Sequence, residues 1–273
     1  MNVPVKLAAV QMASGPQVAA NLHEAGRLIE KAARAGARLV VLPENFAIMA
    51  LRDAERLAVA ERDGTGPIQE FLAQQARTHG LWLVGGTIPL QTQEAKRVRA
   101  ACLVYNDRGE RAARYDKIHL FDVKLDNGEE YNESAAIEPG DEPIVIDTPF
   151  GRLGLAVCYD LRFPELFRQL LDRGAHLFAV PSAFTVHTGR AHWEVLVRAR
   201  AVENLAYVVA SNQGGYHLDG RETYGDSMIV NPWGEVLDRL SRGSGVVLAD
   251  FDRNFFDQTR QRFPSIQHRR LRS

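Results

Sequence analysis

Cys158 is the residue whose surroundings are best suited to chemistry. It directly follows the apolar run 153–157, and it precedes a polar turn and a predicted helix that begins at Pro164. Ligands bind at strand ends in α/β sheets, and a turn from strand to helix exposes a side chain and aims backbone N–H groups at one point. This setting suits a nucleophile beside an oxyanion hole. The alternative is a buried cysteine that packs as a small apolar residue, as we expect of Cys102.

A cysteine nucleophile needs a base, and the sequence offers a histidine or a carboxylate for that role. Of the eight histidines, His119 is the best placed. The carboxylate candidate is Glu44, which lies just beyond a predicted buried strand. Lys117 follows another predicted strand, and Glu133 lies in the long polar segment 115–143. Each of these three charged residues, taken alone, is typical of a solvated loop.

The composition excludes several classes of protein. The chain has 33 Lys+Arg against 34 Asp+Glu, and 45% of its residues are hydrophobic. A disordered chain would have fewer apolar residues, and a dedicated nucleic-acid binder would carry a cationic surplus. No window approaches the roughly 20 apolar residues of a membrane span, and two cysteines are too few for a disulfide framework. We therefore expect a cytoplasmic protein that binds neither nucleic acid nor membrane.

Motifs for other kinds of chemistry are absent from the sequence. It contains no HExxH, no CxxC, no Walker loop and no glycine-rich dinucleotide fingerprint after a strand. We therefore expect neither a metal nor a cofactor. The segment 1–12 reads as a first strand rather than a signal peptide. The basic tail 260–273 is expected to be solvated or to contact another subunit.

The pattern of elements predicts an α/β fold with two packed sheets and helices outside them. Consecutive strands without intervening helices argue against a doubly wound sheet or a barrel. No linker or repeat divides the chain, so we expect a single domain over 1–273. Strands are predicted at 5–11, 38–42, 81–87, 99–106, 112–115, 144–147, 152–157, 176–180, 206–211, 227–230, 235–240 and 245–251, and helices at 19–35, 164–172, 191–205 and 254–262, with a helix-rich segment at 52–79.

Three separated segments together resemble the catalytic signatures of the nitrilase (carbon–nitrogen hydrolase) superfamily. They are Leu42-Pro43-Glu44, the segment Tyr115 to Asp122, and the segment Gly154 to Glu165. The resemblance extends from Val5 to about Arg270. It implies a four-layer αββα sandwich and a homodimer or higher homo-oligomer.

The resemblance also implies a role for each of four residues. Glu44 matches the general base, Lys117 the lysine that stabilises the oxyanion, and Cys158 the nucleophile. Glu133 matches a second glutamate, which would hold Lys117 or orient the substrate. We expect the Lys117 charge to favour the Cys158 thiolate, whereas the sign of the pKa shift of Glu44 stays open because burial and Lys117 act in opposite directions.

Further residues are expected around the substrate. The backbone N–H of Tyr159 would be a second oxyanion donor. Arg162 and Arg190 would pair with substrate carboxylates or, alternatively, form internal salt bridges. The residues after a predicted strand end would line the pocket; they are Ser182, Ala183 and Phe184.

The predicted function is hydrolysis of a small-molecule amide through a cysteine thioester. The segments 181–184, 189–201, 224–228 and 267–270 are most similar to the branch of amidases that repair deaminated glutathione, releasing 2-oxoglutarate and cysteinylglycine. The nearest alternative is an ω-amidase acting on 2-oxoglutaramate or another small dicarboxylate monoamide. A nitrile-processing enzyme and a non-catalytic scaffold are the remaining alternatives.

Overall fold

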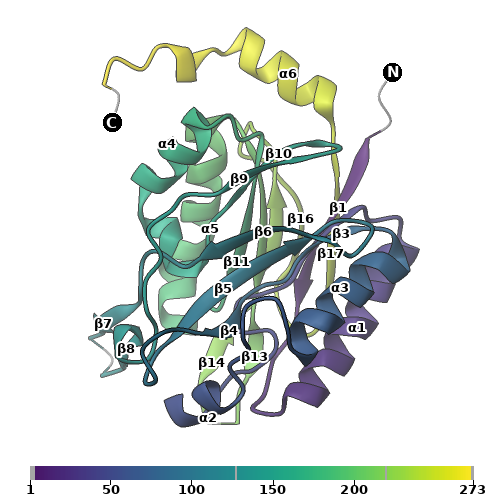
Figure 1. Ribbon diagram of the computed structural model, residues 1–273. Helices are drawn as coiled ribbons and strands as arrows, with labels where there is room; N and C mark the ends of the chain where they lie inside the picture. The colour runs from purple at the N-terminus through teal and green to yellow at the C-terminus, as the bar shows by residue number, and fades with distance from the viewer. Residues whose placement is uncertain (1–3, 127, 219, 272–273) are drawn as a thin grey trace.

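The computed structural model describes residues 4–126, 128–218 and 220–271 (Figure 1). The first three residues of the predicted amino-terminal strand segment lie outside the described residues, as do Arg272 and Ser273 of the basic tail.

The first sheet has seven strands in the order β17-β1-β2-β3-β5-β4, with β6 also paired to β5. Its centre is parallel, because β2 pairs in parallel with both β1 and β3. The other pairings in this sheet are antiparallel. The bounds are β1 Val5–Gln11, β2 Leu39–Val41, β3 Trp82–Val84, β4 Ile88–Gln91, β5 Val98–Tyr105, β6 Arg111–Asp116 and β17 Gly245–Phe251.

The second sheet has six strands in the order β16-β15-β12-β11-β10-β9, and it too has a parallel centre, formed by β10, β11 and β12. Its strands are β9 Val145–Thr148, β10 Gly151–Leu155, β11 Leu177–Ser182, β12 Tyr207–Asn212, β15 Ser227–Val230 and β16 Val236–Leu240. Two hairpins lie outside the sheets, formed by β7 Asp122–Lys124 with β8 Glu130–Asn132 and by β13 Gly214–Tyr216 with β14 Glu222–Tyr224.

Helices cover the outer face of each sheet, which gives the expected four-layer αββα sandwich (Figure 1). The helices α1 Val18–Arg34 and α3 Pro67–His79 pack on the first sheet, and α4 Pro164–Asp172 and α5 Val186–Asn204 on the second. Helix α1 forms because its apolar residues recur at helical spacing: Ala25, Leu28, Ile29 and Ala32 are buried on one face. The short helix α2 spans Asp53–Ala58, and α6 spans Arg253–Arg262.

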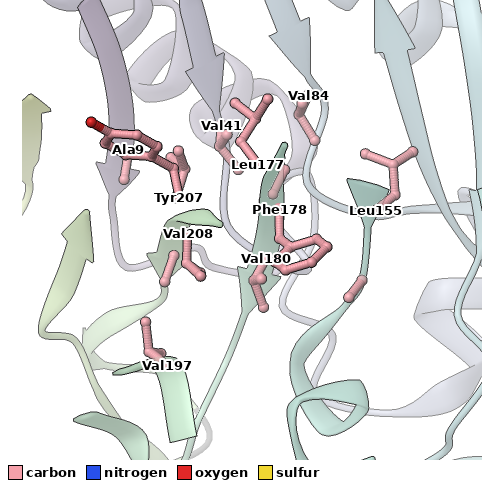
Figure 2. Packing of buried hydrophobic residues seen from close by; sticks show 14 of the residues in the cluster. Ala9, Val41, Val84, Leu155, Leu177, Phe178, Val180, Val197, Tyr207 and Val208 are labelled. Carbon is pink, nitrogen blue, oxygen red and sulfur yellow. The ribbon is translucent and has the colours of Figure 1, made fainter. Parts of the chain in front are cut away.

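The central strands are buried on both faces, as their continuous apolar runs predict. Along β2, Leu39 and Val41 point into the core between the sheets, whereas Val40 packs beneath the helices α1 and α3. Figure 2 shows the core between the sheets, where Val41 of β2 lies beside Leu177 of β11. The two sheets therefore share one core, and this packing fixes the strand ends of one sheet relative to those of the other.

The structure corrects several predicted boundaries. The expected strand 81–87 ends at Val84, because Gly85 and Gly86 break it, and the separate strand β4 follows. The polar segment 115–143 carries the hairpin β7–β8 and a 3₁₀ turn, Glu133–Ala135. Helix α5 begins at Val186, five residues before the predicted start, because the side chain of Thr185 accepts a hydrogen bond from the N–H of Thr188 and caps it.

Two arginines of the basic tail contact the second sheet's helices and the loops beside them, while residues 261–263, 267–268 and 270–271 are exposed to solvent. The Arg260 guanidinium donates to the carbonyl oxygens of Ala175, Asn204 and Leu205. Arg269 forms an ion pair with Asp172 at the end of α4. Within the described ranges, no helix is long and apolar enough to cross a bilayer.

We expect Phe178→Ala to destabilise the protein by about 3–5 kcal/mol, because the change leaves a cavity in the core. Phe178 is fully buried on β11, and its ring packs edge-on against Phe167 at 5.1 Å between centroids. Urea unfolding measures the loss. Leu51→Ala is the control, since Leu51 is 43% exposed and should change stability by less than about 0.5 kcal/mol. Equal effects of the two substitutions would contradict this view of the core.

Candidate active site

A cavity of about 390 Å³ opens where strand ends of both sheets meet. Its lining includes Glu44, which follows β2, and Lys117, which follows β6. Cys158 follows β10, and Ala183 follows β11. Chain segments that are far apart in the sequence therefore present an ammonium, a carboxylate and a thiol to one cavity.

The backbone around Glu44 is fixed by its neighbours. Gly86 has φ +56 and approaches so closely that a methyl group there would meet the Pro43 carbonyl oxygen at 2.1 Å. Asn45 N–H donates to the Thr87 hydroxyl at 2.9 Å, and the Gln213 side-chain amide donates to the Glu44 carbonyl oxygen at 3.0 Å. These contacts hold the carboxylate in the cavity without using its own oxygens.

The Lys117 ammonium is bonded to two carboxylates. Its Nζ donates to Glu44 Oε1 at 2.8 Å and to both oxygens of Glu133, at 2.9 and 2.8 Å. The Lys117 and Glu44 side chains are only 2% and 4% exposed. Glu133 is positioned in turn by the N–H of Phe121, which donates to its Oε2 at 2.7 Å. The contacts of Glu133 thus support the first of its two expected roles, that of holding Lys117.

Cys158 opens a 3₁₀ turn, Cys158–Arg162, directly before α4. Its φ of +48 is a left-handed conformation that a non-glycine residue adopts only when its surroundings enforce it. The turn is anchored by Arg200 of α5, whose guanidinium donates to the Leu161 carbonyl oxygen at 2.9 and 2.7 Å. The strained turn directs the thiol into the cavity.

The charges of the site follow from burial and from an excess of carboxylates. Burial, opposed by Lys117 and assisted by Glu133, raises the pKa of Glu44 above its ordinary value. Burial, followed by the Glu44 charge, raises the pKa of the Cys158 thiol well above its ordinary value, and Lys117 only partly opposes them. Burial lowers the pKa of Lys117, but Glu133 and Glu44 together raise it well above its ordinary value. The resting site therefore holds a neutral thiol beside a charged lysine.

The predicted substrate-binding residues divide into two groups. Tyr159, Arg162, Ala183 and Phe184 line the cavity. The other two are corrected by the structure, because Ser182 and Arg190 do not line it. Ser182 is fully buried and donates to the Val180 carbonyl oxygen, and Arg190 is exposed on α5, which begins earlier than predicted.

Arg162 lies over two aromatic rings of the cavity wall. Its guanidinium carbon is 5.6 Å from the Tyr159 ring centroid and 5.4 Å from that of Phe184. Its Nη1 contacts Nδ1 of His192 at 3.2 Å. Within the part of the chain that the structure describes, Arg162 forms no ion pair with a carboxylate, so the alternative of an internal salt bridge is not formed there.

Sequence reasoning missed several residues of the cavity. Arg56 of α2, Arg221 and His217 line it but lie in segments that carry no recognisable motif. Gln213, which fixes the Glu44 backbone, lies between β12 and β13 and has no signal of its own. In the described residues there is no cluster of three or more His, Cys, Asp or Glu that could hold a metal ion.

We expect iodoacetamide to alkylate Cys158 before Cys102. Cys158 lines the cavity, whereas Cys102 is fully buried in the core, and burial raises the pKa of its thiol far above the ordinary value. Peptide mapping by mass spectrometry after substoichiometric labelling measures the order. The Cys158→Ala variant should stay unlabelled under the same conditions, and preferential labelling of Cys102 would contradict the assignment.

Comparisons with known proteins agree with this architecture. The model of the family described as carbon-nitrogen hydrolase matches residues 6–261. The chain is 41% identical to the deaminated glutathione amidase of Synechocystis, over 97% of this chain and 98% of that protein. It is 42% identical to the human deaminated glutathione amidase, over 97% of this chain and 82% of that protein.

Solved structures of members of this superfamily have the same fold as this chain. The Caenorhabditis elegans NitFhit protein superposes with a TM-score of 0.91 at 38% identity; 98% of this chain and 65% of the worm chain are covered. Saccharomyces cerevisiae Nit3, a member of branch 10 of the nitrilase superfamily, superposes with a TM-score of 0.88 at 31% identity, covering 98% and 97% of the two chains. With sheet order, cavity and sequence in agreement, this chain belongs to the carbon–nitrogen hydrolase family of the nitrilase superfamily.

Proposed function

We propose that this chain hydrolyses the amide bond of deaminated glutathione, releasing 2-oxoglutarate and cysteinylglycine through a thioester on Cys158. The observation that carries the proposal is the meeting of Cys158, Glu44 and Lys117 in one cavity, with Lys117 Nζ 2.8 Å from Glu44 Oε1. Such a site contains the nucleophile, proton carrier and cation that acyl transfer requires. The names of the similar amidases support the choice of substrate.

The acylation step begins with the neutral thiol. The Cys158 sulfur attacks the amide carbonyl carbon while the Glu44 carboxylate accepts the thiol proton, as the raised pKa of Glu44 favours. The carbonyl oxygen becomes an anion that the Lys117 ammonium and the Tyr159 N–H stabilise. Loss of one such donor costs about 2.7–4 kcal/mol of transition-state stabilisation. Glu44 then protonates the leaving nitrogen, the C–N bond breaks, and the thioester remains.

The deacylation step uses the same groups in reverse. Glu44, again a carboxylate, takes a proton from a water molecule that attacks the thioester carbonyl carbon. Lys117 stabilises the second oxyanion, and the C–S bond breaks. The proton held by Glu44 returns to the sulfur, so the acid is released and the neutral thiol is restored. Glu133 holds Lys117 throughout through its two hydrogen bonds.

Arg162 is the proposed partner of the carboxylate on the 2-oxo acid part of the substrate. It lines the cavity four residues after Cys158 and has no carboxylate partner within the described ranges. A guanidinium can bind a carboxylate through two parallel hydrogen bonds. The aromatic rings of Tyr159 and Phe184 would hold the guanidinium plane in place.

The number of arginines favours a substrate with two carboxylates. Deaminated glutathione carries one on its 2-oxo acid and one on its terminal glycine, whereas 2-oxoglutaramate carries only the first. Besides Arg162, the cavity is lined by Arg56 and Arg221. Arg56 pairs at 3.3 Å with Asp53, whose side chain is 60% exposed, and such exposed pairs are weak enough to exchange partners. Arg221 donates to the Ala50 carbonyl oxygen at 2.7 Å, which holds its guanidinium at the cavity wall. The ω-amidase alternative offers no second substrate carboxylate to Arg56 and Arg221.

We propose further that residues 1–273 act as a single domain, as a homodimer or higher homo-oligomer, in the cytoplasm. An apolar surface supports the self-association: Val195 and Val202 of α5 and the edge-on pair Trp233 and Phe263 are each 45–61% exposed. Both cysteines are free, which suits a reducing compartment.

The substrate assignment is tested by comparing kcat/KM for deaminated glutathione, 2-oxoglutaramate and a small nitrile. We expect the highest value for deaminated glutathione, because its leaving group reaches the additional arginines. Release of 2-oxoglutarate, coupled to a dehydrogenase, measures the two amides, and ammonia release measures the nitrile. Cys158→Ala should abolish turnover while retaining the fold by circular dichroism. A higher kcat/KM for 2-oxoglutaramate would establish the ω-amidase alternative, and turnover by Cys158→Ala would exclude the thioester.

We expect the acid limb of the pH profile of kcat/KM to lie above pH 4.5. Glu44 must be ionised to accept the thiol proton, and burial raises its pKa above the ordinary value of 4.5, so activity falls as the pH drops through that raised pKa. The Lys117 pKa is raised as well, so its charge persists on the alkaline side. Initial rates in constant-ionic-strength buffers measure the profile. An acid limb at or below pH 4.5 would contradict the role of Glu44.

We expect Arg221→Ala to lower kcat/KM for deaminated glutathione by about 10-fold or more, the usual effect of losing a hydrogen bond to a charged group. The value for 2-oxoglutaramate should change by less than about threefold, since that substrate lacks the second carboxylate. Arg190→Ala is the matched control, because Arg190 lies outside the cavity. An equal loss on both amides would show that Arg221 does not contact the leaving group.

A further inference from the structure

We propose that Asp160 is a positioning residue for this reaction. Its buried carboxylate ties the segment that carries Lys117 to the turn that carries Cys158, and so fixes the ammonium relative to the thiol. The inference rests on the proposed roles of Lys117 and Cys158, and it adds a residue that does not touch the substrate.

The contacts of Asp160 reach both segments. Its side chain is fully buried. Oδ2 accepts hydrogen bonds from the Tyr115 hydroxyl at 2.6 Å and from the Val157 N–H at 2.8 Å. Oδ1 accepts from the His119 N–H at 3.1 Å and contacts His119 Nδ1 at 2.7 Å. Tyr115 and His119 lie two residues before and after Lys117, and Val157 directly precedes Cys158.

These contacts require a carboxylate rather than an amide. Each oxygen of Asp160 faces one backbone N–H, that of His119 on Oδ1 and that of Val157 on Oδ2. A backbone N–H can only donate, so an asparagine in either orientation would turn its NH₂ group against one of them. A buried donor left without an acceptor is costly. Asn therefore preserves the shape of the side chain and breaks one of its two connections.

The neighbouring groups keep this arrangement fixed at working pH. Burial and the Asp160 charge raise the pKa of Tyr115 well above its ordinary value, so the hydroxyl remains a donor. The His119 ring stacks on Phe163 at 3.6 Å between centroids, which holds its Nδ1 toward Asp160. The Asp160 N–H also donates to the Val157 carbonyl oxygen at 3.0 Å. Asp160 and Val157 thus close a small ring around the strained Cys158.

A purely structural role would have a different signature from a positioning role. If Asp160 only stabilised the fold, its loss would reduce the number of folded molecules and leave each folded site unchanged. If it sets the placement of Lys117 and Cys158, each folded site would be slower, since a misplacement of about 1 Å costs on the order of 10²-fold in rate. Rates must therefore be expressed per titrated Cys158 thiol.

The primary experiment compares Asp160→Asn with Asp226→Asn. Asp226 is a matched control because it is also buried, at 3% exposure, pairs with Arg239 outside the active-site cavity, and has a φ of +57 that asparagine tolerates. We expect Asp160→Asn to lower kcat per titrated thiol by about 10²-fold, with KM changed by less than about threefold. Asp226→Asn should leave both constants unchanged.

A second measurement needs no substrate. The rate of Cys158 alkylation by iodoacetamide against pH reports the charges that face the thiol, which are Glu44, Lys117 and, beyond them, Glu133. Withdrawal of Lys117 removes the charge that favours the thiolate, so we expect the alkylation midpoint of Asp160→Asn to move to higher pH. The midpoint of Asp226→Asn should stay at the wild-type value.

Tyr115→Phe keeps the proposal testable if Asp160→Asn does not fold. It removes one of the hydrogen bonds to Asp160, and we expect kcat per titrated thiol to fall about two- to tenfold. An unchanged kcat per thiol and an unchanged alkylation midpoint, in Asp160→Asn or else in Tyr115→Phe, would overturn the proposal. A wild-type protein inactive on every amide would instead refute the proposed function, and the alkylation profile would still decide the role of Asp160.

Discussion

The structure around the cavity depends on one buried ammonium group. Lys117 is almost fully enclosed, and a charge in such a place is tolerated only when opposite charges contact it directly. Glu44 and Glu133 supply that contact from positions 73 residues before and 16 residues after Lys117. Removing one partner of a buried ion pair typically costs about 3–5 kcal/mol. The fold must therefore hold the Lys117, Glu44 and Glu133 side chains rigidly in contact with one another.

The sandwich meets this requirement by placing strand ends beside one another. Glu44 follows a central parallel strand of the first sheet, and Cys158 follows a central parallel strand of the second. The two sheets share a core, so neither strand end can move without disturbing the other. Burial in this site raises the pKa of Glu44, although the Lys117 charge opposes it. Burial and the Glu44 charge together keep the neighbouring Cys158 thiol protonated at rest.

The sequence predicted those elements whose patterns are local. The strands β1, β15 and β17 and the helix α4 have the predicted bounds, because a continuous apolar run or a proline start marks them. The strands of the hairpin β13–β14 have three residues each and carry no apolar run, so only long-range pairing reveals them. Strand β4 was not predicted, because it contains Pro89 and follows a pair of glycines.

Prediction of the site was likewise limited to residues that stand in local sequence patterns. Glu44, Lys117, Cys158 and Glu133 were found because they stand in recognisable motifs, and the structure brings all four together. Arg190 was chosen only because a guanidinium can bind a carboxylate, and the structure places it on the exposed surface of α5 outside the cavity. The bonds from Asp160 to Tyr115 and His119 and from Gln213 to Glu44 connect residues 41 or more positions apart, and no local pattern encodes such contacts.

The hairpin β13–β14 contributes to the cavity wall but carries none of the residues assigned to bond cleavage. It contributes Arg221, His217 and Thr223 to the cavity wall, yet it belongs to neither sheet. The groups that break and form bonds are attached to the sandwich instead. If the hairpin receives the leaving group as proposed, substitutions of its cavity-facing residues change which amines the site accepts without touching Cys158, Glu44 or Lys117. His217 and Thr223 are also buried and hydrogen-bonded, so changes there alter the packing of the hairpin as well.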